Sequence, residues 1–340
     1  MNIEQLTGED AQAVREWAET TAASQRHEIG EGATAWAHQE LLAVLRRPPV
    51  RRHDELWVAR VDGEVVGTAW LSRPLLDNRE SASLDVHVRP DLRRRGIGTA
   101  LLRHVEGVAA AAGRVLVDAE TQWPADGPAD GAGTAGVEFL RRHGYAFGLG
   151  DVQRVADLPL DEGLLAELAA ETAPYHQGYA LRSWSGRVPD ELVEGWVAVA
   201  STLMTEAPTG AMERETETTD VAAFRDDEAL LVAQGRTAWH TVALDPAGEV
   251  VAYTQLVVPS YDERFVYQWG TLVRRDHRGH RLGTAVKVAN HRALQAGADL
   301  AGRRVVTWNA ESNAHMIAIN ERLGFVPNAR LGELQKRLAR

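Results

Sequence analysis

The sequence predicts an α+β fold made of two tandem domains. With 340 residues, the chain is longer than most single domains. One order of elements occurs twice: a hairpin, a strand, a turn rich in Arg and Gly, a helix, a strand and a short helix. Gly283 of the second turn follows Gly98 of the first by 185 residues, and a repeat of this length indicates a duplicated domain. Each half mixes helices with hairpins, which favours α+β layers over a regular βαβ sheet.

The elements of the first half follow from local signals. Apolar residues at helical spacing predict helices over 11–24 and 33–45, and Pro48-Pro49 ends the second. Asp62-Gly63, a strong hairpin signal, predicts that 55–60 and 64–71 pair as strands. The remaining predictions are a strand over 83–88, a helix over 96–112, a strand over 114–119, a short helix ending at His143-Gly144, and a strand through about residue 155.

An acidic helix over 161–173 then precedes Pro174, and the pattern starts again. The predicted elements of the second half are a strand over 179–184, helices over 190–204 and 219–234, a hairpin of 237–244 and 250–258, a strand over 265–273, a helix over 282–298, a strand over 304–308 and a helix over 312–323. We therefore expect an N-terminal domain over 1–158, a helical connector over 159–176 and a C-terminal domain over 177–340.

Composition narrows the classes of function. The formal net charge is −11, which disfavours nucleic acid as a partner. The absence of Cys excludes disulfides, thiolate metal sites and cysteine nucleophiles, and it fits a reducing compartment. No apolar run approaches the roughly 20 residues of a membrane span, and the first residues lack the pattern of a signal peptide. His277 and His280 have no third ligand at a suitable spacing. We expect a cytoplasmic protein with no metal and no membrane partner.

The two Arg/Gly turns are the strongest candidates for a binding site. Each leads from a strand to the N-terminus of a helix, where unpaired backbone N–H groups and the helix dipole favour an anion such as phosphate. The first turn reads Arg93-Arg94-Arg95-Gly96-Ile97-Gly98, and the second reads Arg278-Gly279-His280-Arg281-Leu282-Gly283. A solvated basic turn is the alternative, and the repetition of the whole element order argues against it.

This element order resembles the GCN5-related N-acetyltransferases (GNAT). The first turn matches the family's Arg-x-x-Gly-x-Gly motif for the acetyl-CoA pyrophosphate, whereas Arg281 replaces a Gly of the second. The resemblance implies two tandem GNAT-like domains, each a mixed, mostly antiparallel sheet with helices on both faces, and acetyl-CoA as co-substrate. The implied cofactor-binding residues are Val86, His87, Val88, Arg93, Arg94, Arg95, Gly96, Ile97, Gly98, Thr99, Thr271, Leu272, Val273, Arg278, Gly279, His280, Arg281, Leu282, Gly283, Thr284, Asn309 and Asn313.

The resemblance favours the second half for catalysis. Residues 309–325 look like the family's last motif, in which Asn313 falls where a side chain contacts the pantetheine arm. Asn320 falls where many members have a Tyr that protonates the leaving thiolate, whereas the first half has Gly133 and Leu140 at these two positions. The acid–base candidates of the second half are Tyr267, His240, Glu311, His315 and Asn320.

The first half keeps a candidate of its own. Asp85 lies three residues before Val88, on the strand that would line the thioester, and its carboxylate could act as a base. Its counterpart in the second half is Gly270, which permits a bulge or a close approach to the backbone. Ordinary structural roles remain open for Asp85, His240 and His315, and helix capping remains open for Asn313 and Asn320.

The implied activity is transfer of an acetyl group from acetyl-CoA to a primary amine of a small molecule, by direct attack in a ternary complex. The first half would retain cofactor binding or a structural role. Two alternatives stay open: a non-catalytic CoA-binding scaffold or sensor, which the missing Tyr supports, and an acyltransferase for a longer acyl-CoA. The acceptor class (antibiotic, amino acid, polyamine or thiol-precursor sugar) and the choice between monomer and homodimer stay open as well.

Overall fold

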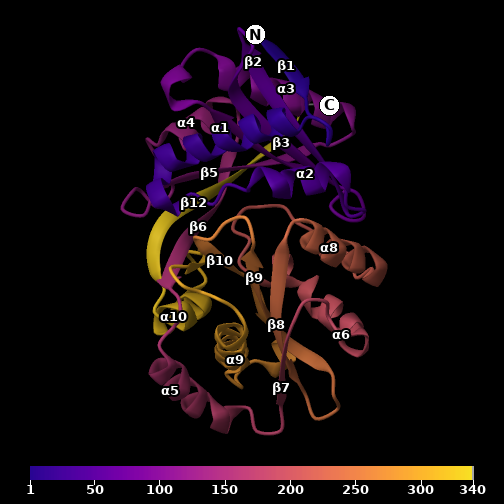
Figure 1. Cartoon of the computed structure of the whole chain (residues 1–340), viewed down its shortest axis with the longest axis vertical. Coiled ribbons are helices and arrows are strands. Elements are labelled where there is room, and N and C mark those ends of the chain that lie inside the picture. Colours follow the sequence, from indigo (N-terminus) through magenta and orange to yellow (C-terminus); the bar gives the residue numbers. More distant parts are fainter. Residues whose placement is uncertain (339–340) are drawn as a thin grey trace. The chain divides into compact units, whose positions relative to one another are not determined.

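The chain divides into two units whose boundaries do not follow the order of the sequence. The computed structural model describes residues 1–338 (Figure 1). Unit 1 contains Met1–Val152, Thr209–Glu215 and the residues from Asn328 onward. Unit 2 contains Gln153–Pro208 and Thr216–Pro327. Both units mix helices with a sheet, so the predicted α+β class is confirmed.

Unit 1 is built on a mixed sheet in the order β1-β2-β3-β4-β5-β12. Neighbouring strands are antiparallel except β4 and β5, which are parallel. Its elements are β1 (Asn2–Gln5), α1 (Ala11–Ile29), α2 (His38–Arg46), β2 (Arg52–Val61), β3 (Glu64–Pro74), β4 (Ser81–Val88), α3 (Ile97–Ala111), β5 (Leu116–Pro124), α4 (Ala135–Arg142), the start of β6 (Ala146–Asp157) and most of β12 (Val326–Arg337).

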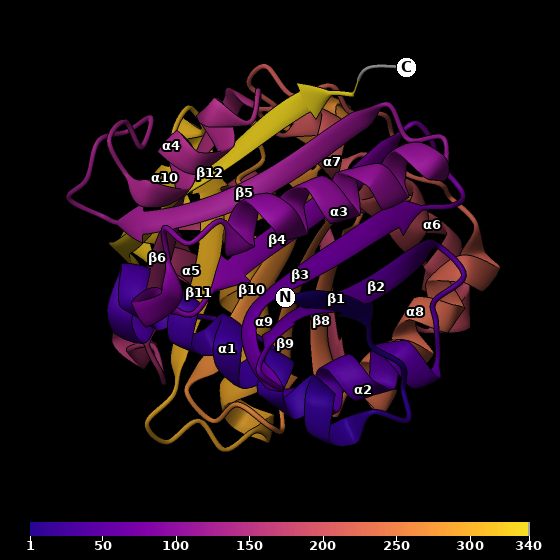
Figure 2. The ribbon, with the colours of Figure 1, turned by 90° about the horizontal axis from the view of Figure 1, so that it is seen from above.

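Helices cover both faces of this sheet because apolar side chains alternate along its strands. On one face, Leu56 and Val58 of β2 pack with residues of α1 and α2 such as Trp17 and Leu41. On the other face, Leu84 of β4 joins a core made with α3 and α4. Figure 2 shows α3 along the strands of unit 1 and α1 and α2 beside them.

One local feature of the unit 1 sheet prepares the site. β4 and β5 pair in parallel register from Ser81 opposite Leu116 to Leu84 opposite Ala119, and the pairing ends there. The last residues of β4, Asp85 to Val88, continue to pair with β3 on the other side. The edge of β4 that faces β5 is therefore unpaired over these residues.

Unit 2 has a sheet in the order β11-β10-β9-β8-β7, with the end of β6 beside β11. The β10–β11 pair is parallel, and the pairs from β10 through β7 are antiparallel. Its elements are α5 (Glu162–Thr172), β7 (Ala180–Ser185), α6 (Asp190–Ala200), α7 (Leu203–Glu206), α8 (Val221–Ala233), β8 (Arg236–Leu244), β9 (Val250–Pro259), β10 (Phe265–Val273), α9 (Leu282–Gly297), β11 (Arg304–Ala310) and α10 (Ala314–Arg322).

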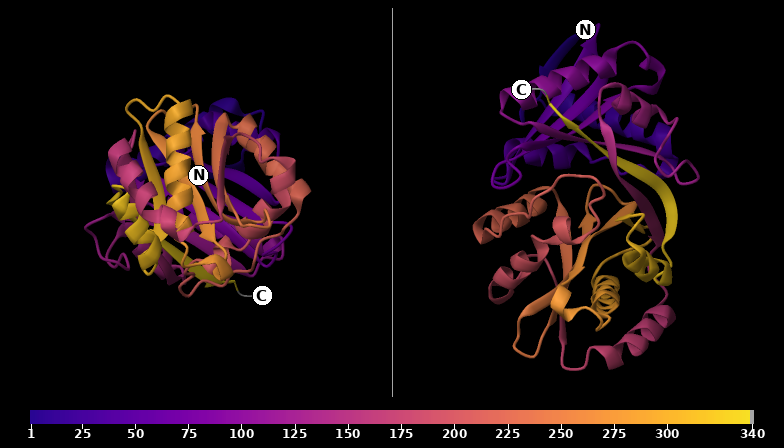
Figure 3. Two further views of the ribbon diagram at one scale, coloured as in Figure 1. Left: turned by 90° about the horizontal axis from the view of Figure 1, so that it is seen from below. Right: turned by 180° about the vertical axis from the view of Figure 1, so that it is seen from behind.

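The two faces of the unit 2 sheet also carry separate cores. Trp196 of α6 packs on Val242 and Tyr253 on one face. On the other face, α9 and α10 share a core with Leu165 and Leu168 of α5. Figure 3 shows α9 against the strands of this unit, with α5 next to it in Figure 1. The segment expected to be a connector is thus part of the core of unit 2.

The units differ from the ranges 1–158, 159–176 and 177–340 in two further places. β12, at the end of the chain, pairs with β5 from Ala329 opposite Pro124 to Arg337 opposite Leu116, so it completes the sheet of unit 1. The segment Thr209–Glu215, called the strap below, also belongs to unit 1. Long-range pairing produces both differences, and a local reading of the sequence does not detect such pairing. β1 and β12 were not among the expected strands.

Candidate functional site

The turn of unit 1 presents unpaired backbone donors. Arg94 and Gly96 both have positive φ, 64° and 83°, and α3 begins at Ile97 without a side-chain cap. The first N–H groups of a helix have no partner within that helix. No acidic residue lies in the first turn of α3. The turn therefore has the donors and the dipole that bind an anion.

Arg93 anchors this turn to α1. Its guanidinium donates to the Ser24 hydroxyl (3.1 Å) and to the Val88 carbonyl (3.4 Å), and it forms an ion pair with Glu28. This inward direction of Arg93 leaves Arg94 and Arg95 as the exposed cations of the turn.

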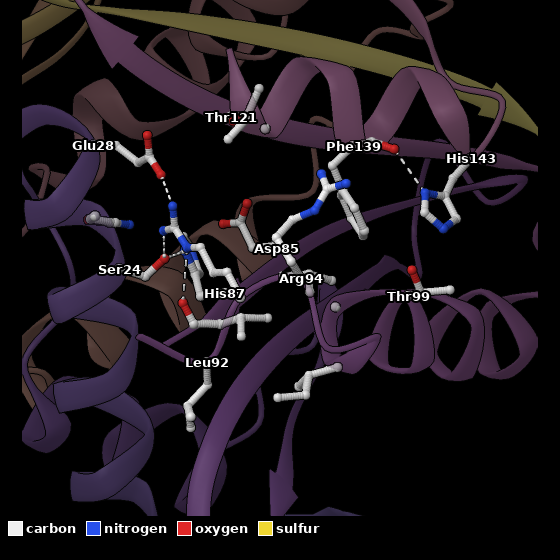
Figure 4. A pocket seen from close by; sticks show the side chains of 18 of the residues that line it. Ser24, Glu28, Asp85, His87, Leu92, Arg94, Thr99, Thr121, Phe139 and His143 are labelled. Atoms are coloured by element: carbon white, nitrogen blue, oxygen red, sulfur yellow. Dashed lines mark hydrogen bonds and ion pairs between the residues drawn. The ribbon is translucent and has the colours of Figure 1, made fainter. Parts of the chain in front are cut away.

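A cavity of about 370 Å³ opens beside the turn. Figure 4 shows Asp85 and Arg94 projecting into it from β4 and from the turn. Residues from α1, β4, the turn, α3, β5 and α4 line it: Ser24, Gln25, Glu28, Asp85, Val86, His87, Val88, Leu92, Arg93, Arg94, Gly96, Ile97, Gly98, Thr99, Glu120, Thr121, Gln122, Ala135, Gly136, Phe139, Arg142 and His143. The cavity thus joins the anion-binding turn to the gap between β4 and β5.

Backbone groups of β4 face this gap. The N–H of Arg89 donates to the Val66 carbonyl of β3, and the direction of backbone groups alternates along a strand. The N–H and C=O groups of Val86 and Val88 therefore point away from β3. The bond from Arg93 to the Val88 carbonyl agrees with this direction.

Two carboxyl groups lie where the strands separate. Asp85 and Glu120 directly follow the last paired residues, Leu84 and Ala119, and both line the cavity. Burial raises the pKa of Asp85 to about 7. Glu120 is exposed to the cavity, and its pKa is also raised, first by desolvation from the surrounding protein and then by the charge of Asp85. A carboxyl group that titrates near neutral pH is suited to accept a proton from a substrate.

His87, in contrast, remains neutral at physiological pH. Burial and then the charge of Arg93 lower its pKa to about 4. Its Nδ1 lies 3.2 Å from the Ser24 hydroxyl. His87 therefore contributes a polar wall to the cavity rather than a charge.

The turn of unit 2 has the same pattern of positive φ angles as the turn of unit 1, but its glycine stands at a different position. Its two positive-φ residues are Gly279 (89°) and Arg281 (52°), in the places that Arg94 and Gly96 occupy in unit 1. Each turn thus has one Gly and one Arg at these two places, in opposite order. The irregular motif of the second turn does not prevent the turn from forming.

The cations of the second turn are engaged by other side chains of unit 2. Arg281 pairs with Glu171 and lies 4.0 Å from the ring centroid of Tyr175. Arg275 and Arg278 both pair with Glu206, at 2.6 and 3.0 Å. The Nδ1 of His280 lies 2.9 Å from the Tyr175 carbonyl. Each cation of the second turn named here thus has a partner within unit 2.

The beginning of α9 is also covered. Leu282, Gly283 and Thr284 are buried, whereas Gly98 and Thr99 of unit 1 are half-buried and line the cavity. Lys287, only 1% exposed, donates to the Asn320 side chain (2.9 Å), and burial lowers its pKa to about 7.

The remaining implied cofactor residues of unit 2 are held by other protein groups. Asn320 donates to the Asn309 side chain (2.5 Å), and Asn313 caps α10 by accepting from the Met316 N–H (3.2 Å). Thr271 is buried and shares a 2.7 Å hydrogen bond with Thr254. Leu272 lies in the core under α6, and Val273 is half-buried beside α9.

Gly270 is the counterpart of Asp85, and other side chains fill the space beside it. A Cβ at this position would lie 2.2 Å from the Tyr253 hydroxyl and 2.8 Å from the Leu203 Cδ2. The register of β10 against β9 shifts between Gln268 and Thr271, as the expected bulge would require. The space that a carboxylate occupies in unit 1 is therefore taken by Tyr253 and Leu203 in unit 2.

The structure does not gather the acid–base candidates of unit 2 into one site. His240 is buried beside Trp184 and Trp196 on the α6 face, where burial lowers its pKa to about 4. Tyr267 stacks on Trp308 in a core that also includes Ala238, on the same face as His240. Asn320 lies on the opposite face, against α9. Glu311 and His315 are exposed.

Several residues of the unit 1 cavity were not identified from sequence. They are Ser24, Gln25 and Glu28 of α1, Glu120 and Gln122 of β5, and Arg142 and His143 at the end of α4. The alternation of Asp118, Glu120 and Gln122 along β5 is a signal that could have identified the polar face of this strand. Nothing in the local sequence links α1 to the turn that follows β4.

Residues 1–338 contain neither a metal-binding cluster nor a membrane-spanning helix. No group of three or more His, Cys, Asp or Glu side chains is arranged to hold a metal ion. None of the helices in this part of the chain has the length and apolar character of a membrane span.

Comparisons with known proteins agree with this geometry. The Acetyltransferase (GNAT) family matches residues 12–124 and 196–325. A tandem GNAT protein from the clavulanic acid biosynthesis pathway is similar with a TM-score of 0.77 and 27% identity, over 100% of this chain and 99% of that one. A GCN5-related N-acetyltransferase from Sphaerobacter thermophilus shares the fold with a TM-score of 0.66 and 16% identity, over 99% and 95% of the two chains. No curated protein sequence matches.

Proposed function

The chain belongs to the GNAT acetyltransferase family and has the fold of an acyltransferase, and from this premise we propose that it transfers an acetyl group from acetyl-CoA to a primary amine of a small molecule in the cavity of unit 1. The expected preference for the second half rested on Asn313 and Asn320. The geometry favours the first half, because these side chains are engaged by other groups of unit 2.

One observation carries the proposal: a single cavity joins the anion-binding turn to Asp85. The N–H groups at the start of α3, with Arg94 beside them, fit the pyrophosphate of CoA. The gap between β4 and β5 offers the backbone groups of Val86 and Val88 to the pantetheine arm and the thioester carbonyl. When bound, acetyl-CoA supplies an activated acetyl group.

Asp85 is the base of this proposal. An aliphatic ammonium has a pKa of roughly 10, so it must lose a proton before its nitrogen can attack. The Asp85 carboxylate takes this proton, the new C–N bond forms at the acetyl carbon, and the C–S bond breaks. The backbone N–H groups of Val86 and Val88 can donate to the carbonyl oxygen as charge develops on it. The nitrogen loses its second proton to solvent as the amide forms. The departing thiolate takes a proton from solvent, since Leu140 occupies the position of the family's usual Tyr.

Unit 2 has a structural role in this proposal. Its turn is closed by Glu171, Glu206 and Tyr175. The segment that connects α7 to α8 of this unit includes the strap, which belongs to unit 1.

Two measurements on the full chain test the proposal. Titration calorimetry with CoA should give one site per chain, and acetyl-CoA with an amine panel should release free thiol in an amine-dependent reaction. Tight CoA binding without amine-dependent release would support the scaffold alternative. Two equivalent CoA sites would contradict the assignment to unit 1. Faster thiol release from propionyl- or succinyl-CoA than from acetyl-CoA would show that a longer acyl group is the one transferred.

A further inference from the structure

We propose that the acceptor is a small dication, whose first amino group faces Asp85 and whose second ammonium binds the carboxylates of Glu120 and its neighbours. The inference rests on the proposed function and narrows its substrate class to compounds such as polyamines and amino sugars with at least two amino groups. It follows from the arrangement, the partners and the charge of a group of acidic side chains on one face of the unit 1 sheet.

Strand register brings these side chains together. Glu333 of β12 is paired with Glu120 of β5, and Gln335 with Asp118. Asp85 follows Leu84, whose partner Ala119 precedes Glu120. Directly paired residues of neighbouring strands project to the same face with Cβ atoms about 5 Å apart. Asp85, Asp118, Glu120 and Glu333 therefore form one acidic group that begins in the cavity and extends across β5 to β12.

The carboxylates nearest the cavity lack partners. Among residues 1–338, neither Asp85 nor Glu120 accepts a hydrogen bond or forms an ion pair, and both line the cavity wall. Asp118 accepts a hydrogen bond from Gln335 (2.8 Å). Glu333 pairs with Arg214 of the strap. Asp85 is half-buried and Glu120 is exposed on the cavity wall, so a cationic ligand that enters the cavity can reach and pair with both.

Electrostatics identify the missing charge as positive. Although Glu120 is exposed to the cavity, desolvation by the surrounding protein raises its pKa first, and the charges of Asp85, Glu333 and Asp151 raise it further, whereas Arg214 lowers it. Burial also raises the pKa values of Asp118 and Glu333. One guanidinium is thus set against several carboxylates. An ammonium beside Glu120 would offset the remaining negative charge of the acidic group, whereas a carboxylate on the acceptor would be repelled by it.

The strap holds Arg214 in place. The Ala211 N–H donates to the Gly148 carbonyl (2.9 Å), and Met212 is buried. Glu213 pairs with Arg337 (2.7 Å), and the Glu215 N–H donates to the Asn78 side chain (2.9 Å). Arg214 therefore neutralises the Glu333 side of the acidic group, which leaves the Glu120 side for the ligand.

A matched set of acceptors tests the proposal. Thiol release from acetyl-CoA is measured with 1,4-diaminobutane, butylamine and 4-aminobutanoate, and with diamines of three to six methylenes. We expect kcat/KM for the best diamine to exceed that of butylamine by about tenfold or more, and 4-aminobutanoate to be the poorest. Equal values for diamine and monoamine would overturn the proposal. Preference for 4-aminobutanoate would overturn it as well and would indicate that Arg214 binds a carboxylate.

Two variants locate the second ammonium. Glu120→Gln should reduce the diamine-to-butylamine ratio of kcat/KM towards one. Asp126→Asn, which removes a charge from an exposed loop of unit 1 outside the cavity lining, should keep the ratio of the parent protein. An unchanged ratio in Glu120→Gln would overturn the assignment. Melting curves and CoA titrations of both variants establish that they are folded.

Failure of the proposed function has a different signature. In that case no amine would support thiol release, while calorimetry with 1,4-diaminobutane could still detect a bound dication. Active transfer without discrimination among amines would leave the acetyltransferase assignment intact and reject only the dication.

Discussion

The two turns of this chain have nearly the same backbone and opposite surroundings. Both place residues of positive φ before a helix, at Arg94 and Gly96 in unit 1 and at Gly279 and Arg281 in unit 2. The first turn opens on a cavity with two unpaired carboxylates. The cations of the second turn are paired with Glu171 and Glu206. A conserved turn geometry is therefore compatible with either an open or a closed site, and the neighbouring side chains determine which one forms.

The comparison extends to the strand before each turn. Asp85 in unit 1 corresponds to Gly270 in unit 2, where Tyr253 and Leu203 take the space. Each unit also has a titratable group with a pKa near 7: Asp85 is half-buried and lines the cavity, whereas Lys287 is buried beside Asn320. Three predictions test this contrast.

The largest effect is expected at Asp85. Asp85→Asn should lower kcat/KM by about 10²- to 10⁴-fold, the usual contribution of a positioned base. The pKa of Asp85 is raised to about 7, and the base is its ionised form. The activity of the parent protein should therefore rise with pH through about 7, and this limb should be lost in the variant. If the remaining activity of the variant had the same pH profile as the parent protein, another group would be the base.

A smaller effect on stability is expected at the glycines. Gly270→Ala should lower the free energy of unfolding by about 1–3 kcal/mol, because the new Cβ would overlap the Tyr253 hydroxyl and Leu203. Gly96→Ala meets no atom within 4 Å, so it should cost about 1 kcal/mol from its positive φ alone. Calorimetric unfolding of both variants measures the difference. A larger loss for Gly96→Ala would contradict the closed packing around Gly270.

The smallest effect concerns the cations of the turns. Arg94→Ala should raise the Kd for CoA about fivefold, since an exposed charge contributes roughly 1 kcal/mol. Arg281→Ala removes a cation already engaged by Glu171 and Tyr175, and it should leave the Kd unchanged. Titration calorimetry with CoA compares the two. The reverse result would place the cofactor in unit 2.

Much of the fold could be predicted from local signals. The hairpin around Asp62-Gly63 formed as expected, with φ of 51° and 87° at these residues. The helices after both turns also formed, because their apolar spacing and N-terminal turns are local features. β12 was missed because its partner, β5, lies about two hundred residues earlier in the chain.

The site was harder to predict because it depends on contacts between distant segments. Asp85 and the first turn were identified from their order along one strand and one loop. Glu120, Ser24 and Arg214 come from three other segments, and only the packing of α1, β5 and the strap brings them to β4. The preference for the second half treated Asn320 as a free side chain, whereas Lys287 donates a hydrogen bond to its side-chain oxygen.

The amino-acid order alone was enough to predict the family, the duplication and both Arg/Gly turns, since a turn, a helix start and a repeat are properties of contiguous residues. Which turn is open follows from three-dimensional contacts. Glu171, Tyr175 and Glu206 lie outside the second motif, yet they cover its charges. Electrostatic pairing and burial depend on distance in space, so two similar motifs in one chain have different surroundings.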